Sequence, residues 1–225
     1  AATTLKTQNV SSQNAYCSLA KTHGVVTAAL AVKQVYVLSD AQIIATMTAC
    51  KITAEDIAAV LKQGFNYTAD AAVAAMKSAN LTSRQIMLAL LEIYEHTEDR
   101  AAAALKRAGF TAAQIGDALK EVYGVSAAYA AELLKGLAYS STEVANVVKN
   151  IFGKTMDVAA QVLKNAGYTA GQIAIAMKTT FNANLEVTAG LLKDLFGNAV
   201  VISKALLDAY GATVNAVASV LKNMS

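Results

Sequence analysis

Residues 110–138 read FTAAQIGDALKEVYG followed by VSAAYAAELLKGLA, and they predict two short helices. Thr111 and Ser126 each stand second in their half, where a hydroxyl can accept a free backbone N–H of the first helical turn. Gln114 follows Thr111 by three residues and completes a capping box. Gly124 supplies the left-handed residue that ends the first helix.

The same helix pair recurs with a period of 29 residues from His23 onward. Further capping boxes are expected at Thr82/Gln85, Ser140/Glu143 and Thr169/Gln172, and further helix ends at Asn66, Gly109, Gly153, Gly167, Asn182 and Gly211. One column of the repeat is aromatic and consists of Tyr36, Phe65, Tyr94, Tyr123, Phe152, Phe181 and Tyr210; a second consists of Met47, Met76, Leu105, Leu134, Leu163, Leu192 and Leu221. Columns that stay in register over seven periods identify a repeat protein.

Helices this short cannot bury an apolar stripe alone, so they must stack on their neighbours. We therefore predict an all-α fold, an α-solenoid of about seven helix-pair repeats. The array is expected to cover residues 23–225 as a single domain, preceded by an irregular lead-in helix in residues 1–22. No linker and no low-complexity segment interrupts it.

The composition excludes several classes of protein. The 225 residues are 55% hydrophobic and 16% charged, which excludes intrinsic disorder. No stretch approaches the eighteen apolar residues that a membrane span needs, so no span is expected. A net charge of +3 is too small to indicate nucleic-acid binding by itself.

The two cysteines, Cys17 and Cys50, are expected to form a disulfide. They are 33 residues apart, close to one period, which places them on neighbouring rungs of the stack. The opening residues Ala1-Ala2-Thr3-Thr4 resemble what remains after cleavage behind small residues, so we expect a secreted or cell-surface protein. Two reduced thiols in a cytoplasmic protein are the alternative.

Lysines form two further columns with the same period. In the second helix of each pair they are Lys77, Lys106, Lys135, Lys164, Lys193 and Lys222; in the first helix they are Lys33, Lys62, Lys120, Lys149 and Lys178. One interpretation is a pair of basic ridges that bind a polyanion or nucleic acid. The favoured interpretation is local, because a cation in the last turns of a helix complements the dipole and its stem covers apolar surface.

The aromatic residues fall into two sets with different expected environments. The column from Tyr36 to Tyr210 ends the first helix of each pair, and we expect it to lie in the core. A second set, Tyr67, Phe110, Tyr139 and Tyr168, lies between helices and is expected to be half exposed, which makes it the better place for contacts.

No enzyme, metal site or cofactor is expected. The densest charged cluster is residues 95–100. Glu92, His96 and Asp99, with Glu95 nearby, offer a metal interpretation. The favoured alternative is that Thr97 caps a helix whose first turn carries acidic residues. With two histidines and no nucleophile–base spacing, the sequence predicts no catalytic constellation.

The ends of the array carry few charges, whereas polar capping repeats are usual in solenoids. Residues 1–50 contain Lys6, Lys21, Lys33 and Asp40 as their only charges. We therefore expect either a piece of a longer solenoid or ends that another copy covers. Candidate assembly contacts are Val200, Val201, Leu206, Val217 and Val220.

Three functions follow from these expectations. The first is a non-catalytic structural scaffold that associates head to tail into a fibre or surface array. The second is a module that binds another protein or peptide along the repeat surface. The third is polyanion binding along the lysine columns, against which the small net charge counts.

Overall fold

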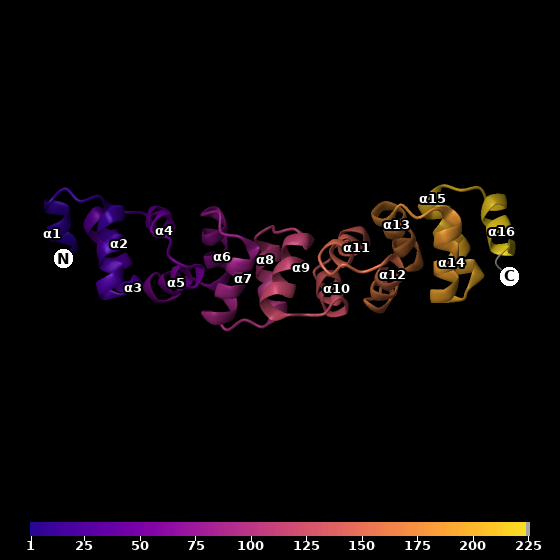
Figure 1. The fold of residues 1–225 in the computed structure, drawn as a ribbon, viewed down its shortest axis with the longest axis horizontal. Helices are drawn as coiled ribbons and strands as arrows, with labels where there is room; N and C mark the ends of the chain where they lie inside the picture. Colours follow the sequence, from indigo (N-terminus) through magenta and orange to yellow (C-terminus); the bar gives the residue numbers. More distant parts are fainter. Residues whose placement is uncertain (224–225) are drawn as a thin grey trace. The chain divides into compact units, whose positions relative to one another are not determined.

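The computed structural model describes residues 1–223, and within them every regular element is helical (Figure 1). The chain forms two compact units, Ala1–Phe110 and Thr111–Ser225. The first contains α1 (Ala2–Thr7), α2 (Ser12–His23), α3 (Val25–Tyr36), α4 (Asp40–Ala49), α5 (Ala54–Ala59) with its π-helical continuation η1 (Val60–Gly64), α6 (Ala69–Ser78), α7 (Ser83–Glu92) and α8 (Glu98–Arg107). The second contains α9 (Ala112–Ala118) with its continuation η2 (Leu119–Tyr123), α10 (Ala127–Gly136), α11 (Ser141–Asn150), α12 (Met156–Asn165), α13 (Ala170–Phe181), α14 (Leu185–Phe196), α15 (Ala199–Tyr210) and α16 (Val214–Asn223).

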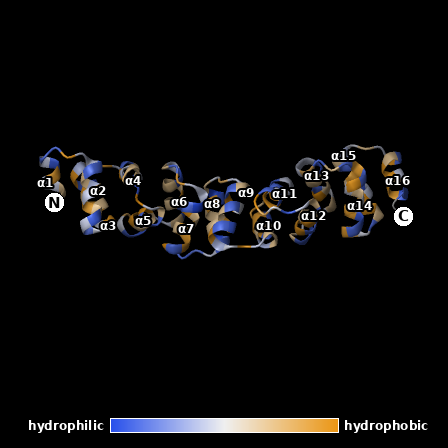
Figure 2. Cartoon of the chain, viewed as in Figure 1, coloured by the Kyte–Doolittle hydropathy of each residue, from blue (hydrophilic) through white to orange (hydrophobic). Residues whose placement is uncertain are grey.

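Each unit is a two-layered stack of helix pairs, as the repeat predicts. Helices pack on their next-but-one neighbours, so odd-numbered helices with η1 and η2 form a first layer and even-numbered helices a second. Figure 2 shows hydrophobic and hydrophilic residues mixed along single helices, the pattern of helices that bury one face. The predicted all-α helical-repeat solenoid is confirmed.

The predicted caps account for the helix boundaries. Both halves of the capping box form at Thr82/Gln85, Thr111/Gln114, Ser140/Glu143 and Thr169/Gln172, and a fifth box forms at Ser39/Gln42. Every predicted helix-ending glycine or asparagine has a positive φ. Val37 also has one, φ 58°, although a β-branched side chain is strained in that region.

The methionine and leucine column of the repeat lies in the core. Met47, Met76, Leu105, Leu134, Leu163 and Leu192 are fully buried, whereas Leu221 in α16 is half-buried. The first-layer helices also approach each other closely through small residues. A Cβ atom added to Gly116 would lie only 2.5 Å from Cγ1 of Val147, so α9 and α11 leave no room for a methyl group there.

Residues 1–22 hold two helices, where the sequence predicts one lead-in helix. α1 packs on α3 and α2 packs on α4, so the pair extends both layers of the first unit. The exposed side chains of α1 and α2 are almost all polar and uncharged, with Thr3, Thr4, Gln13, Asn14 and Ser18 among them. This end therefore has the polar surface of a capping pair, which the low charge of the sequence conceals. Within residues 1–223 no helix has the length and hydrophobicity that crossing a bilayer requires.

Candidate functional site

The lysines of the repeat reach forward to the next rung. Lys149 in α11 donates a hydrogen bond from Nζ to the carbonyl oxygen of Thr180 in α13, at 2.6 Å. Its Nζ also lies 4.9 Å from the centre of the Phe181 ring. The ammonium group thus contacts the carbonyl end of the next first-layer helix, α13, and the ring of the last residue of that helix. Both partners favour a cation.

This contact recurs in both layers, and we call it the lysine ladder. The carbonyl oxygens that accept these bonds lie 31 or 32 residues after the lysine in the sequence, and the aromatic rings lie 32 or 33 residues after it. In the first layer Lys33 lies 4.4 Å from the Phe65 ring centre, Lys62 lies 5.3 Å from Tyr94, and Lys178 lies 5.1 Å from Tyr210 while bonding the Ala209 carbonyl at 2.9 Å. In the second layer Lys77 bonds the Ala108 carbonyl at 2.5 Å and lies 4.8 Å from the Phe110 ring centre. Lys135 bonds the Gly167 carbonyl at 2.7 Å and lies 5.3 Å from the Tyr168 ring centre. Lys164 bonds the Leu195 carbonyl and lies 5.4 Å from the Phe196 ring centre.

The ladder changes the interpretation of the predicted basic ridge. Of the six candidate residues, Lys77, Lys135 and Lys164 use their ammonium groups between rungs. Lys106 is half-buried, and Lys193 and Lys222 are exposed. As the favoured local interpretation expects, the ladder lysines lie in the last turns of their own helices. Their ammonium groups in addition bond carbonyl oxygens at the end of the next rung.

The expected environments of the two aromatic sets are reversed. All seven residues of the column from Tyr36 to Tyr210 are half-buried, although we expected them in the core. Phe110, Tyr139 and Tyr168, expected to be half exposed, are at most 5% exposed, and Tyr67 is half-buried. The Tyr168 hydroxyl donates to the Tyr139 carbonyl at 2.7 Å, and burial raises the Tyr168 pKa to about 12. Three members of the second set, Phe110, Tyr139 and Tyr168, are therefore part of the packed interior and offer little contact surface.

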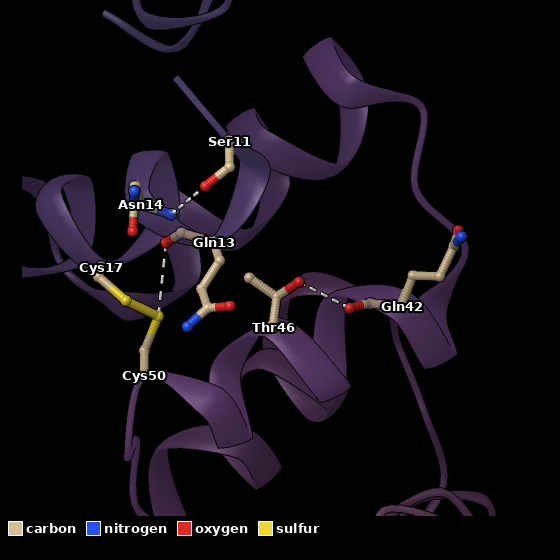
Figure 3. The surroundings of a disulfide bond; sticks show 7 residues. All are labelled: Ser11, Gln13, Asn14, Cys17, Gln42, Thr46 and Cys50. Atoms are coloured by element: carbon tan, nitrogen blue, oxygen red, sulfur yellow. Dashed lines mark hydrogen bonds between the residues drawn. A yellow bond between two sulfur atoms is a disulfide. The ribbon is translucent and has the colours of Figure 1, made fainter. Parts of the chain in front are cut away.

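The predicted disulfide is present (Figure 3). Cys17 on α2 and Cys50 at the end of α4 have Cα atoms 5.6 Å apart, within the range that a disulfide allows. The carbonyl oxygen of Gln13 lies 3.5 Å from the Cys50 sulfur (Figure 3). The bond joins neighbouring helices of the second layer, as the spacing predicts.

The charged cluster lines a surface hollow of about 500 Å³ between α6 and α8. Arg107 holds Asp70 with two hydrogen bonds, of 2.6 and 3.1 Å. Burial lowers the pKa of His96, and the charge of Arg100 lowers it further. Asp99 lies in the hollow, but Glu92 and Glu95 are not among its lining residues. In the described part of the chain no three His, Cys, Asp or Glu side chains converge on a common point.

The candidate assembly residues separate into exposed and buried groups. Val200 is 79% exposed and Val201 is 42% exposed, and Val214, which the sequence analysis did not select, is 70% exposed. We call these three valines of α15 and α16 the C-terminal face. Val220 is half-buried, whereas Leu206 and Val217 are buried. The last two belong to core columns of the repeat, so changing them would test folding rather than assembly.

Sequence reasoning missed one exposed feature of the second unit. Tyr129, Val158 and Val187 are 38%, 44% and 45% exposed, and each is the third residue of its helix, α10, α12 and α14. They are 29 residues apart, so the repeat aligns them across the second layer. We call them the apolar row. Their common column could have revealed them, because most of its other members are polar.

Comparisons with protein-family models, curated proteins and solved structures found no match for this chain.

Proposed function

We propose that this chain is a non-catalytic structural scaffold that associates with a second copy through its C-terminal face. The observation that carries the proposal is the exposure of Val200 and Val214, at 79% and 70%. Exposed aliphatic side chains gain free energy when a partner removes them from water, by about 25 cal/mol per Å² of apolar area.

The substitution pattern in the repeat supports this contact. Val201 occupies the position that holds Gln114, Glu143 and Gln172 in the three preceding first-layer helices, where each completes a capping box. In α15 that polar function is given up, and Asn198 alone caps the helix. An aliphatic side chain has therefore replaced a useful polar one at an exposed position.

The two ends of the chain differ in a way that favours a pair of C-terminal faces. Val against Val buries apolar surface on both sides, whereas head-to-tail contact would set these valines against the mostly polar exposed side chains of α1 and α2. A contact between identical faces is isologous and closes after two copies. We therefore expect end-to-end dimers in preference to the open fibre that head-to-tail contact would give.

The remaining features fit a scaffold exported from the cell. The Cys17–Cys50 disulfide supports a secreted or cell-surface location, because such bonds persist in oxidising compartments. The lysine ladder counts against polyanion binding, because its ammonium groups would have to leave carbonyl oxygens to reach phosphates. Thiol titration of the denatured, unreduced natural protein should find no free thiol; two thiols would contradict an oxidising location.

Sedimentation velocity over a concentration series tests the association. The unmodified chain should form dimers, and the double variant Val200→Glu/Val214→Glu should remain monomeric with unchanged circular dichroism. Ile175→Glu is the matched control, because Ile175 is 43% exposed and lies on α13 rather than on α15 or α16. A chain that stays monomeric at millimolar concentration contradicts the proposal. Fibres in electron micrographs would contradict the pairing of identical faces and would indicate head-to-tail contact.

A further inference from the structure

The apolar row is not required by the fold. The same column is exposed throughout the second layer, and in the first unit it holds Gln42, Ala71 and Arg100. Those rungs stack in the same way as the rungs of the second unit. The exposed positions of Val158 and Val187 could therefore hold a polar residue without loss of packing.

Unpaired acidic side chains accompany the row. Asp157 and Glu186 each immediately precede a valine of the row, and Glu132 follows Tyr129 by one helical turn. All three are exposed, and none forms an ion pair within residues 1–223. The surface is thus an apolar line with carboxylates beside it.

We infer that the apolar row of the second unit binds an amphipathic basic helix of another protein. Packed helices are about 8–10 Å apart, so successive row residues have about that spacing. Residues seven apart on an α-helix are about 10.5 Å apart along its axis and lie on nearly the same face. An apolar residue at every seventh position can therefore contact Tyr129, Val158 and Val187 in turn. Lysine or arginine beside each apolar residue would meet Glu132, Asp157 and Glu186.

The surface is separate from the C-terminal face. Its residues lie on α10, α12 and α14, whereas the valines proposed to pair two copies lie on α15 and α16. Helix binding and dimerisation can therefore be tested independently, and variants of one surface serve as controls for the other.

A designed peptide provides the test. A helical peptide of about 21 residues, with leucine at every seventh position and lysine beside each leucine, is titrated against the chain by fluorescence anisotropy. We expect saturable binding that Val158→Glu weakens by at least about tenfold, the effect of losing one buried valine contact. A peptide of the same composition in scrambled order is expected to bind at least about tenfold more weakly. Ile175→Glu and Val200→Glu should leave binding unchanged.

The charge pattern is tested by a swap. Asp157→Lys/Glu186→Lys should weaken binding of the lysine peptide and bind a peptide in which glutamate replaces lysine. Circular dichroism checks that each variant is folded, which is expected because all the changed residues are exposed. Absence of binding, equal binding of the scrambled peptide, or indifference to Val158→Glu would each overturn the inference.

Discussion

Replacing Lys149 by methionine isolates one rung of the lysine ladder. Methionine preserves the length and most of the apolar stem of the side chain and removes the ammonium group. The variant loses the 2.6 Å hydrogen bond to the Thr180 carbonyl and the position 4.9 Å from the Phe181 ring centre. The carbonyl lies near the end of α13, where no backbone N–H of its own helix compensates for the loss.

The expected cost follows from these two contacts. A hydrogen bond from a charged donor contributes about 1.5–3 kcal/mol in a protected site, and a cation–π contact at a partly exposed site about 0.5–1 kcal/mol. Lys149 is half-buried, so water replaces part of what is lost. We expect Lys149→Met to lower the free energy of unfolding by about 1–2 kcal/mol.

Urea unfolding followed by circular dichroism measures this difference against a matched control. Lys154→Met makes the same chemical change at an exposed lysine of the same unit, outside the ladder, and should cost less than about 0.5 kcal/mol. A double-mutant cycle with Phe181→Leu should give a coupling energy of about 0.5–1 kcal/mol between the lysine and the ring. Equal effects of the two lysine substitutions, with no coupling to Phe181, would refute the ladder as a source of stability.

Three further predictions, the first with a control substitution, follow from local geometry. Gly116→Ala should destabilise the chain by about 1–3 kcal/mol in urea unfolding, because the added methyl group would collide with Val147. Gly136→Ala is the control and should be neutral or slightly stabilising, because nothing lies within 4 Å of the added carbon. Val37→Asn should raise the free energy of unfolding by about 1 kcal/mol, since asparagine tolerates a positive φ and Val37 is 83% exposed; a loss of stability would show that this valine has a structural role. Cys17→Ser should cost about 3–4 kcal/mol by opening a loop of 33 residues, and an unfolding curve unchanged from the oxidised protein would contradict that cost.

The repeat, the caps and the disulfide were predictable because each depends on chemistry within one repeat or between adjacent rungs of fixed spacing. Thr111 with Gln114 specifies a helix start whatever surrounds it, and a glycine such as Gly124 specifies a helix end. The burial of Leu206 was also available from the sequence, since it shares a column with Leu119, Val148 and Met177, which are all fully buried. Leu206 was predicted as an assembly contact, but its column indicates that it is buried.

The ladder and the aromatic environments were not predictable in the same way. The lysine and aromatic columns have the same period, but the period does not say whether a lysine meets the ring of its own rung or of the next. That choice depends on the offset between stacked helices, which side-chain packing determines. Val37 shows a second limit, because a β-branched residue gives no signal for the left-handed conformation that it adopts.

The disulfide joins two second-layer helices where the lysine ladder is absent. In the lysine column of the second layer, α2 has Leu19 and α4 has Thr48, so the ladder lacks its first two lysines. A lysine at position 19 would meet the carbonyl of Cys50, the residue that the disulfide joins to α2 instead. Between α4 and α6 the Tyr67 hydroxyl donates to Asp40 at 2.7 Å, and Lys33 pairs with the same carboxylate at 2.5 Å, which together hold its pKa below the usual range. These two rungs of the first unit thus have other bonds across them, and the covalent one joins the polar pair at the N-terminal end to the repeats.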